Sequence, residues 1–112
     1  MELRSHLAGS INILELSGRF DNYTAPAVVE WLEKATGTIP AQVVINLTHV
    51  NFIDSTALAT LVQGMRRCEE RQGKLHLCCL QQQVYMIFEL TRLNKAFPIF
   101  ASESQAVEAF SN

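Results

Sequence analysis

The sequence of 112 residues has little of what marks several specialised classes of protein. No run approaches the ~20 consecutive apolar residues that a membrane-spanning helix needs, and the first residues lack the apolar stretch of a signal peptide. The net charge is only −2, with acidic and basic residues interspersed, so no basic patch for nucleic acid is expected. These absences predict one soluble, cytoplasmic domain over residues 1–112, without membrane insertion or a nucleic-acid partner.

Cysteine is also scarce. The three cysteines are an odd number, which argues against the disulfide framework of a small secreted protein. They include no C-x-x-C pair, although His76 and Cys78 share one face of an expected strand. Cys78 and Cys79 are best interpreted as small apolar thiols buried in that strand. We therefore expect neither a metal ion nor a cofactor.

Glycine-rich phosphate loops are absent too, because the five glycines stand apart. The residues around Ser55, among them Asp54 and Ala57, do not supply the flanking glycines of a hydrolase nucleophile elbow. No histidine lies at a spacing that pairs it with Ser55; the three are His6, His49 and His76. A triad assembled only in space stays open. The sequence nevertheless favours a protein that is not an enzyme and has no catalytic residues.

What the sequence does contain is apolar patterning almost from end to end. Strand-like segments lie at residues 3–7, 11–16, 43–47, 75–80 and 98–100. Helical spacing occupies residues 25–35, 57 to about 72, 84–91 and 102–110, with Thr24 as the expected cap of the first helix. Trp31 lies at the edge of the first apolar stripe, a position that favours a partly buried core residue over an anchor for a partner. Strands that alternate with helices after an initial hairpin predict an α/β domain: a mixed, mostly parallel sheet of four to five strands, with four α-helices.

Asp54, Ser55 and Thr56 stand where an expected strand meets the strongest helical stripe of the chain. Unpaired N–H groups and the positive end of the helix dipole converge at such a junction, which suits a phosphate. A simpler interpretation is that one of the three residues only caps the helix. Local chemistry thus leaves three roles open for Ser55: nucleophile, phosphate acceptor and helix cap.

Three segments of the sequence resemble motifs of the STAS domain family. Residues 16–21 (LSGRFD) with Thr24-Ala25 are similar to the L-x-G-x-hydrophobic-D…T-A opening of these domains. Residues 46–47 and 52–56 (NL…FIDST) resemble their phosphorylation-site segment. Residues 88–97 (FELTRLNKAF) are similar to their F-E-L-T-G-L-x-K-x-F stretch. The three motifs occur in order over essentially the whole chain.

This resemblance implies a compact domain with four helices around a mixed sheet, and a function like that of bacterial anti-sigma-factor antagonists. Such a protein binds an anti-sigma factor that is also a serine kinase, and its phosphorylation by the kinase is reversed by a serine phosphatase. Carried over, Ser55 is the phosphate acceptor and Thr56 a second candidate. The expected partner-binding residues are Asp21, Asp54, Ser55, Thr56 and Ala57.

The same family offers two other roles. The alternative to a switch is a small STAS subunit of a lipid-transport ABC complex that binds the ATPase subunit. A third role, the module of an anion transporter, is less favoured. The sequence also departs from the family pattern twice. Ala57 and Arg92 stand where the family usually has glycine. We expect Ala57 to affect the approach of a partner, and Arg92 to alter a helix-end turn away from the switch.

Overall fold

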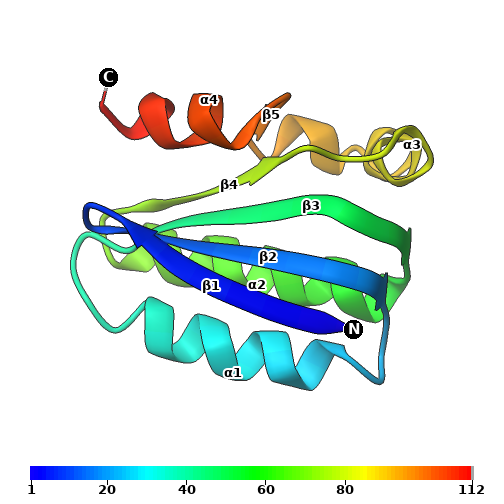
Figure 1. The fold of residues 1–112 in the computed structure, drawn as a ribbon, viewed down its shortest axis with the longest axis horizontal. Coiled ribbons are helices and arrows are strands. Elements are labelled where there is room, and N and C mark those ends of the chain that lie inside the picture. Colours follow the sequence, from blue (N-terminus) through cyan, green and yellow to red (C-terminus); the bar gives the residue numbers. More distant parts are fainter. Residues whose placement is uncertain (112) are drawn as a thin grey trace.

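A five-stranded sheet in the order β1-β2-β3-β4-β5 forms the centre of the protein (Figure 1). The structure is a computed structural model that describes residues 1–111, so only the last residue of the predicted domain lies outside it. The strands are β1 (Glu2–Ala8), β2 (Ile11–Phe20), β3 (Gln42–Ile53), β4 (Lys74–Cys78) and β5 (Ile99–Phe100). The α-helices are α1 (Ala25–Ala35), α2 (Ser55–Glu70), α3 (Gln82–Leu90) and α4 (Glu103–Glu108), with short 3₁₀ turns at Leu93–Lys95 and Ala109–Ser111.

The predicted fold class and the order of elements are confirmed. β1 pairs antiparallel with β2, and every later pair of neighbouring strands is parallel. Parallel neighbours need crossover connections, and α1 and α2 supply those between β2, β3 and β4. No helix within residues 1–111 is long and apolar enough to cross a membrane.

β2 and β3 are longer than the sequence predicted. The prediction ended them at residues 16 and 47, but they continue to Phe20 and Ile53 and stay paired to their ends. Gly18 permits the longer β2 because it adopts φ +100°, a conformation that glycine takes without strain. The pairing of β2 with β3 shifts register on either side of Gly18 and then continues. Both strands therefore reach the end of the sheet at which α2 begins.

β4 is shorter than the predicted segment, which ran to residue 80. It ends at Cys78 because Cys79 takes a left-handed conformation (φ 63°) that cannot continue a strand. Cys78 is buried as expected, whereas Cys79 is only half-buried. The interpretation of both cysteines as buried strand residues is therefore wrong for Cys79.

Two apolar clusters pack on opposite faces of the sheet. The larger lies under α1, α2 and α3 and includes Leu14, Ile45, Leu61 and Phe88, with Trp31 packed at its edge as predicted. The smaller lies under α4 and includes Ile13, Val44 and Cys78. Neighbours such as Leu14 and Ile13 point to opposite faces because side chains alternate along a strand. Burial on both faces explains the apolar run at residues 43–45 of β3.

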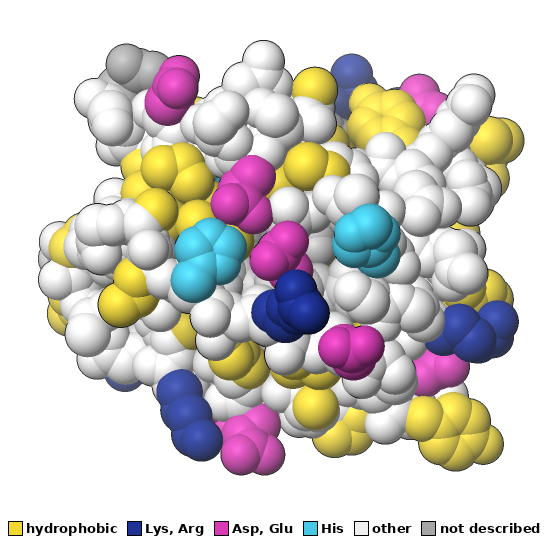
Figure 2. Space-filling model, viewed as in Figure 1, with side chains coloured by type: hydrophobic (Ala, Val, Ile, Leu, Met, Phe, Trp, Pro, Cys, Tyr) yellow, Lys and Arg dark blue, Asp and Glu magenta, His cyan; other side chains and the backbone are white. Residues whose placement is uncertain are grey.

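α4 covers only part of its face of the sheet. Figure 2 shows this side of the molecule, where acidic, basic and histidine side chains gather over the middle of the face. His6 Nε2 lies 3.4 Å from a Glu103 carboxylate oxygen, and Asn46 Nδ2 donates to the other Glu103 oxygen at 2.9 Å. Arg4 and Glu15 are cross-strand partners in the same region. The uncovered sheet face is therefore polar.

His76 holds α4 against the sheet. It is buried, its ring stacks on Phe110 with centroids 3.9 Å apart, and its Nδ1 lies 2.8 Å from the carbonyl oxygen of Ala106. A carbonyl only accepts, so Nδ1 carries the proton. Burial lowers the pKa of His76 and outweighs the hydrogen bond to Ala106, which acts to raise it; nearby Lys74 lowers the pKa a little further. The buried ring therefore serves to pack α4 against the sheet.

The helix ends agree only partly with prediction. At α4, Ser102 and Gln105 form a capping box: the Ser102 hydroxyl accepts from the N–H of Gln105, and the Gln105 side chain accepts from the N–H of Ser102. Thr24 does precede α1, but its hydroxyl makes no capping bond and is used by Asp21 instead. Arg92, just past the end of α3, adopts φ 64°, the left-handed conformation that glycine would take without strain.

Candidate functional site

The predicted site lies at the end of the sheet where β3 leads into α2. Ser55 and Thr56 are the first two residues of α2, and both are exposed. Ile53, which ends β3, pairs with Phe20, which ends β2. The loop between β2 and α1, residues 21–24, therefore begins beside the first turn of α2.

Asp54 is the helix cap at this junction. Its Oδ1 accepts a hydrogen bond from the N–H of Ala57 at 2.9 Å, which satisfies one of the free donors of the first turn. Within residues 1–111, the hydroxyls of Ser55 and Thr56 make no hydrogen bond in this structure. The cap predicted for one of these three residues is therefore Asp54, and the two hydroxyls are left open to solvent.

Asp54 also joins α2 to the β2–α1 loop. Its Oδ2 accepts a hydrogen bond from the N–H of Asn22 at 2.9 Å, and its own N–H donates to the carbonyl of Phe20 at 3.3 Å. One carboxylate thus binds a backbone N–H of α2 and a backbone N–H of the β2–α1 loop, although Asp54 and Asn22 are 32 residues apart in the chain. Charge-assisted bonds of this kind are stronger than neutral ones, so the loop and the helix end form one rigid unit.

Asp21 orders the loop from inside. Its Oδ1 accepts from the N–H of Tyr23 at 3.0 Å and from the N–H of Thr24 at 3.2 Å, while Thr24 Oγ1 accepts from the N–H of Asp21 at 2.9 Å. Partial burial acts to raise the pKa of Asp21. The donors from Tyr23 and Thr24, together with nearby Arg19, outweigh it and hold the pKa below its ordinary value of 3.8. The charged carboxylate is therefore a structural part of the loop.

Arg19 and Phe52 flank the loop on paired strands. The guanidinium carbon of Arg19 lies 3.7 Å from the centre of the Phe52 ring, and Arg19 Nε lies 3.6 Å from Asp21 Oδ2. The Arg19 side chain is 62% exposed and that of Asp21 only 15%. A half-exposed cation–π contact adds about 0.5–1 kcal/mol and fixes a surface next to the loop.

Ala57 does not belong to this surface. Its side chain is fully buried in the larger core, and its N–H is taken by Asp54. The expectation that its methyl group would affect an approaching partner is therefore not supported, because the methyl points inward. The other four residues that were expected to bind a partner do lie together at the exposed junction: Asp21, Asp54, Ser55 and Thr56.

Asn22, Tyr23, Arg19 and Phe52 are the residues that sequence reasoning missed. A weak signal for the first two was present, since Asp21 followed three residues later by Thr24 is a common hydrogen-bonded turn. Nothing local could show that Asn22 donates to a carboxylate on another element. That contact depends on β2 and β3 ending side by side.

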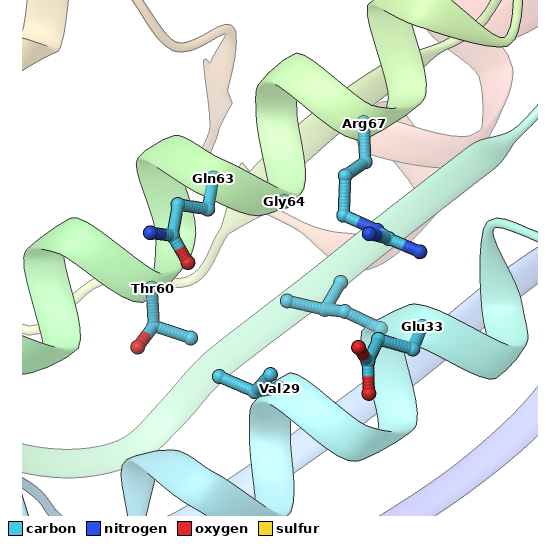
Figure 3. A pocket seen from close by; sticks show the side chains of 7 residues that line it. Val29, Glu33, Thr60, Gln63, Gly64 and Arg67 are labelled. Atoms are coloured by element: carbon cyan, nitrogen blue, oxygen red, sulfur yellow. The ribbon is translucent and has the colours of Figure 1, made fainter.

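A cavity of about 90 Å³ lies between α1 and α2 (Figure 3). Val29 and Gly64 line it, and the side chains of Glu33, Gln63 and Arg67 surround it. Arg67 Nε donates to Thr36 Oγ1 at 3.2 Å, so that side chain is already engaged. The lining contains no histidine, cysteine or aspartate. Among residues 1–111, no group of three His, Cys, Asp or Glu side chains is placed to hold a metal ion.

An Asp54→Ala variant is expected to lose about 2 kcal/mol of unfolding free energy. The substitution removes the helix cap, worth roughly 0.5–2 kcal/mol, and leaves the N–H of Asn22 without its charged partner. Urea denaturation followed by the fluorescence of Trp31, the single tryptophan, measures the change. Asp54→Asn keeps a capping oxygen and should lose less; equal losses for the two variants would contradict this account of the carboxylate.

Comparison with known proteins places these features in one family. The family model described as STAS domain matches residues 4–106. An anti-sigma-B factor antagonist of Listeria monocytogenes is 32% identical over 99 residues, which cover 88% of this chain and 86% of that protein. An anti-sigma F factor antagonist of Paenibacillus polymyxa is 24% identical over 96 residues, covering 85% of this chain and 82% of that protein.

The fold is shared with solved structures. An anti-sigma-factor antagonist (STAS) domain protein from Planctomyces limnophilus superposes with a TM-score of 0.90 at 21% identity, covering 98% of each chain. At that level of identity, the likeness concerns the arrangement of strands and helices rather than the site. The family match over almost the entire chain agrees with the three motifs found in the sequence.

Proposed function

The chain belongs to the STAS domain family, and we propose that it acts as an anti-sigma-factor antagonist that changes partners when Ser55 is phosphorylated. In this proposal the unphosphorylated protein binds an anti-sigma factor that is also a serine kinase. The kinase transfers a phosphoryl group from ATP to the Ser55 hydroxyl, and binding is lost. A serine phosphatase removes the phosphate, and the cycle takes place in the cytoplasm.

The observation that carries this proposal is the division of roles at the start of α2. Asp54 performs the capping that any α/β protein needs, so Ser55 is exposed without a structural task of its own. An exposed hydroxyl on a rigid, well-defined helix end is accessible to a kinase. Thr56, also exposed, is the second candidate acceptor.

A phosphate at Ser55 is compatible with the fold. The N-terminus of α2 carries the positive end of a 16-residue helix dipole, which stabilises an added anion by about 0.3–1 kcal/mol at an exposed position. The same phosphate would add about −1.5 to −2 charge beside the Asp54 carboxylate. Its main effect therefore falls on a partner that must cover this surface, because the partner would have to desolvate the new charge.

Phosphate mapping tests the proposal. We expect the purified protein, incubated with ATP and an anti-sigma serine kinase from its own host, to gain one phosphate, which tandem mass spectrometry assigns to Ser55. Ser55→Ala should lose this modification, whereas Thr56→Ala should keep it. Full modification of Ser55→Ala, or phosphate found only outside residues 54–56, would overturn the assignment.

A further inference from the structure

Tyr23 is the most exposed large hydrophobic side chain within residues 1–111. It is 86% exposed, ahead of Leu90 at 81% and Leu7 at 66%. Its ring is therefore not part of either apolar cluster, and folding does not require it. A tyrosine ring left in water keeps the large stabilisation that burial of an aromatic side chain provides in reserve, so it is available for contact with another molecule.

The backbone under Tyr23 is held firmly although the ring is free. The N–H of Tyr23 donates to Asp21 Oδ1 at 3.0 Å, and the N–H groups on either side of it, of Asn22 and Thr24, donate to Asp54 and Asp21. Three consecutive N–H groups thus bind carboxylates. A ring on such a loop has little freedom to lose on binding, because only its two side-chain torsions remain to be fixed.

The same loop is joined to the proposed phosphorylation site by a single carboxylate. Asp54 Oδ2 accepts from Asn22, which precedes Tyr23, and Asp54 itself precedes Ser55. Tyr23 directly follows one partner of this hydrogen bond and Ser55 directly follows the other, so each is about 3.8 Å along the chain from it. A partner that covers the Ser55 hydroxyl would therefore also reach the loop that carries Tyr23, since a typical interface spans roughly 800 Å² on each partner.

We propose that Tyr23 is the aromatic anchor of the partner interface and enters an apolar pocket on the anti-sigma kinase. This inference rests on the proposed function and adds a residue to its interface. Tyrosine is among the residues that dominate interface energetics, since its ring fills a pocket while its hydroxyl finds a polar group. Asp54 is the positioning residue, because it fixes the loop that presents the ring.

Binding of the unphosphorylated protein to the anti-sigma kinase tests the anchor. We expect Tyr23→Ala to weaken affinity by about thirtyfold, the range of a residue that dominates an interface. Leu90→Ala is the matched control, because Leu90 is almost equally exposed but lies at the end of α3. It should bind as the wild-type protein does. Both variants should keep the wild-type unfolding midpoint, since neither side chain is buried.

A double variant tests the positioning role. If Asp54 acts through Tyr23, the affinity losses of Asp54→Ala and Tyr23→Ala should be less than additive in a double-mutant cycle. Strictly additive losses would overturn that role. If wild-type protein binds the kinase and Tyr23→Ala binds equally well, the anchor is wrong and the proposed function stands. If wild-type protein binds none of the host's anti-sigma kinases, the proposed function and the anchor fall together.

Discussion

A Ser55→Asp variant is expected to bind the anti-sigma kinase at least about 100-fold more weakly than the wild-type protein, a change of about 2.7 kcal/mol. The new carboxylate would lie next to Asp54, whose charge is already held at the helix end by the N–H groups of Ala57 and Asn22. A partner that covers this surface would have to desolvate two neighbouring negative charges. Burying an unpaired charge in an interface typically costs a few kcal/mol. Isothermal titration calorimetry with the unphosphorylated kinase partner measures the effect.

The controls for this variant separate the effect of the added charge on binding from the effects of a lost hydroxyl and of altered folding. Ser55→Ala removes only the hydroxyl and should bind nearly as wild type. Ser104→Asp places the same charge on another exposed serine in the first turn of a helix, on α4, and should leave binding unchanged. Ser55→Asp should itself fold normally, since a carboxylate in the first turn of α2 is favourable. Equal affinities of Ser55→Asp and wild type would contradict inactivation by charge at this position.

A Gly73→Ala variant is expected to lose about 3 kcal/mol or more of unfolding free energy. A methyl group at Gly73 would lie 1.8 Å from the carbonyl oxygen of Ala41 and 2.8 Å from its nitrogen. Ala41 is fully buried and its N–H bonds to the carbonyl of Arg71 at 3.1 Å, so this backbone has no free direction in which to move. The two residues immediately precede β3 and β4, which begin as paired neighbours at Gln42 and Lys74.

Chemical denaturation measures this loss, and a second glycine provides the control. Gly37 follows α1, and a methyl group there would meet only the carbonyl oxygen of Lys34 at 3.3 Å. Gly37→Ala should therefore change the unfolding free energy far less than Gly73→Ala. If Gly73→Ala is produced as soluble protein with a wild-type urea midpoint, the close approach to Ala41 does not constrain the fold as argued.

Gly73 also illustrates where sequence reasoning is incomplete. The sequence correctly indicated that α2 stops before this glycine. The stronger reason for glycine at this position is the backbone of Ala41, 32 residues earlier in the chain, which lies against it; this contact between two loops is not encoded by any local pattern. Arg92 is the opposite case: the motif predicted a change at a helix-end turn, and the structure has the residue in the left-handed conformation at that turn.

Strand lengths show the same division. The apolar centres of β2 and β3 could be predicted from the sequence because both faces of the sheet are buried at residues 13–14 and 43–45. Their polar ends, such as Ser17 and Thr48-His49, carry no such signal, because α4 leaves that part of the sheet face open to solvent. Pairing between neighbouring strands keeps these ends extended, and pairing is a tertiary property.

The sequence by itself determined the order of strands and helices, the mixed α/β fold and the junction at Asp54-Ser55-Thr56, because periodicity and end signals are local. Only the tertiary structure decided what each residue does at that junction. It assigned the cap to Asp54, turned Ala57 into the core, and brought Asn22 and Tyr23 beside the first turn of α2. These roles depend on two parallel strands ending together, and residues 32 apart in the chain meet only after the sheet has formed.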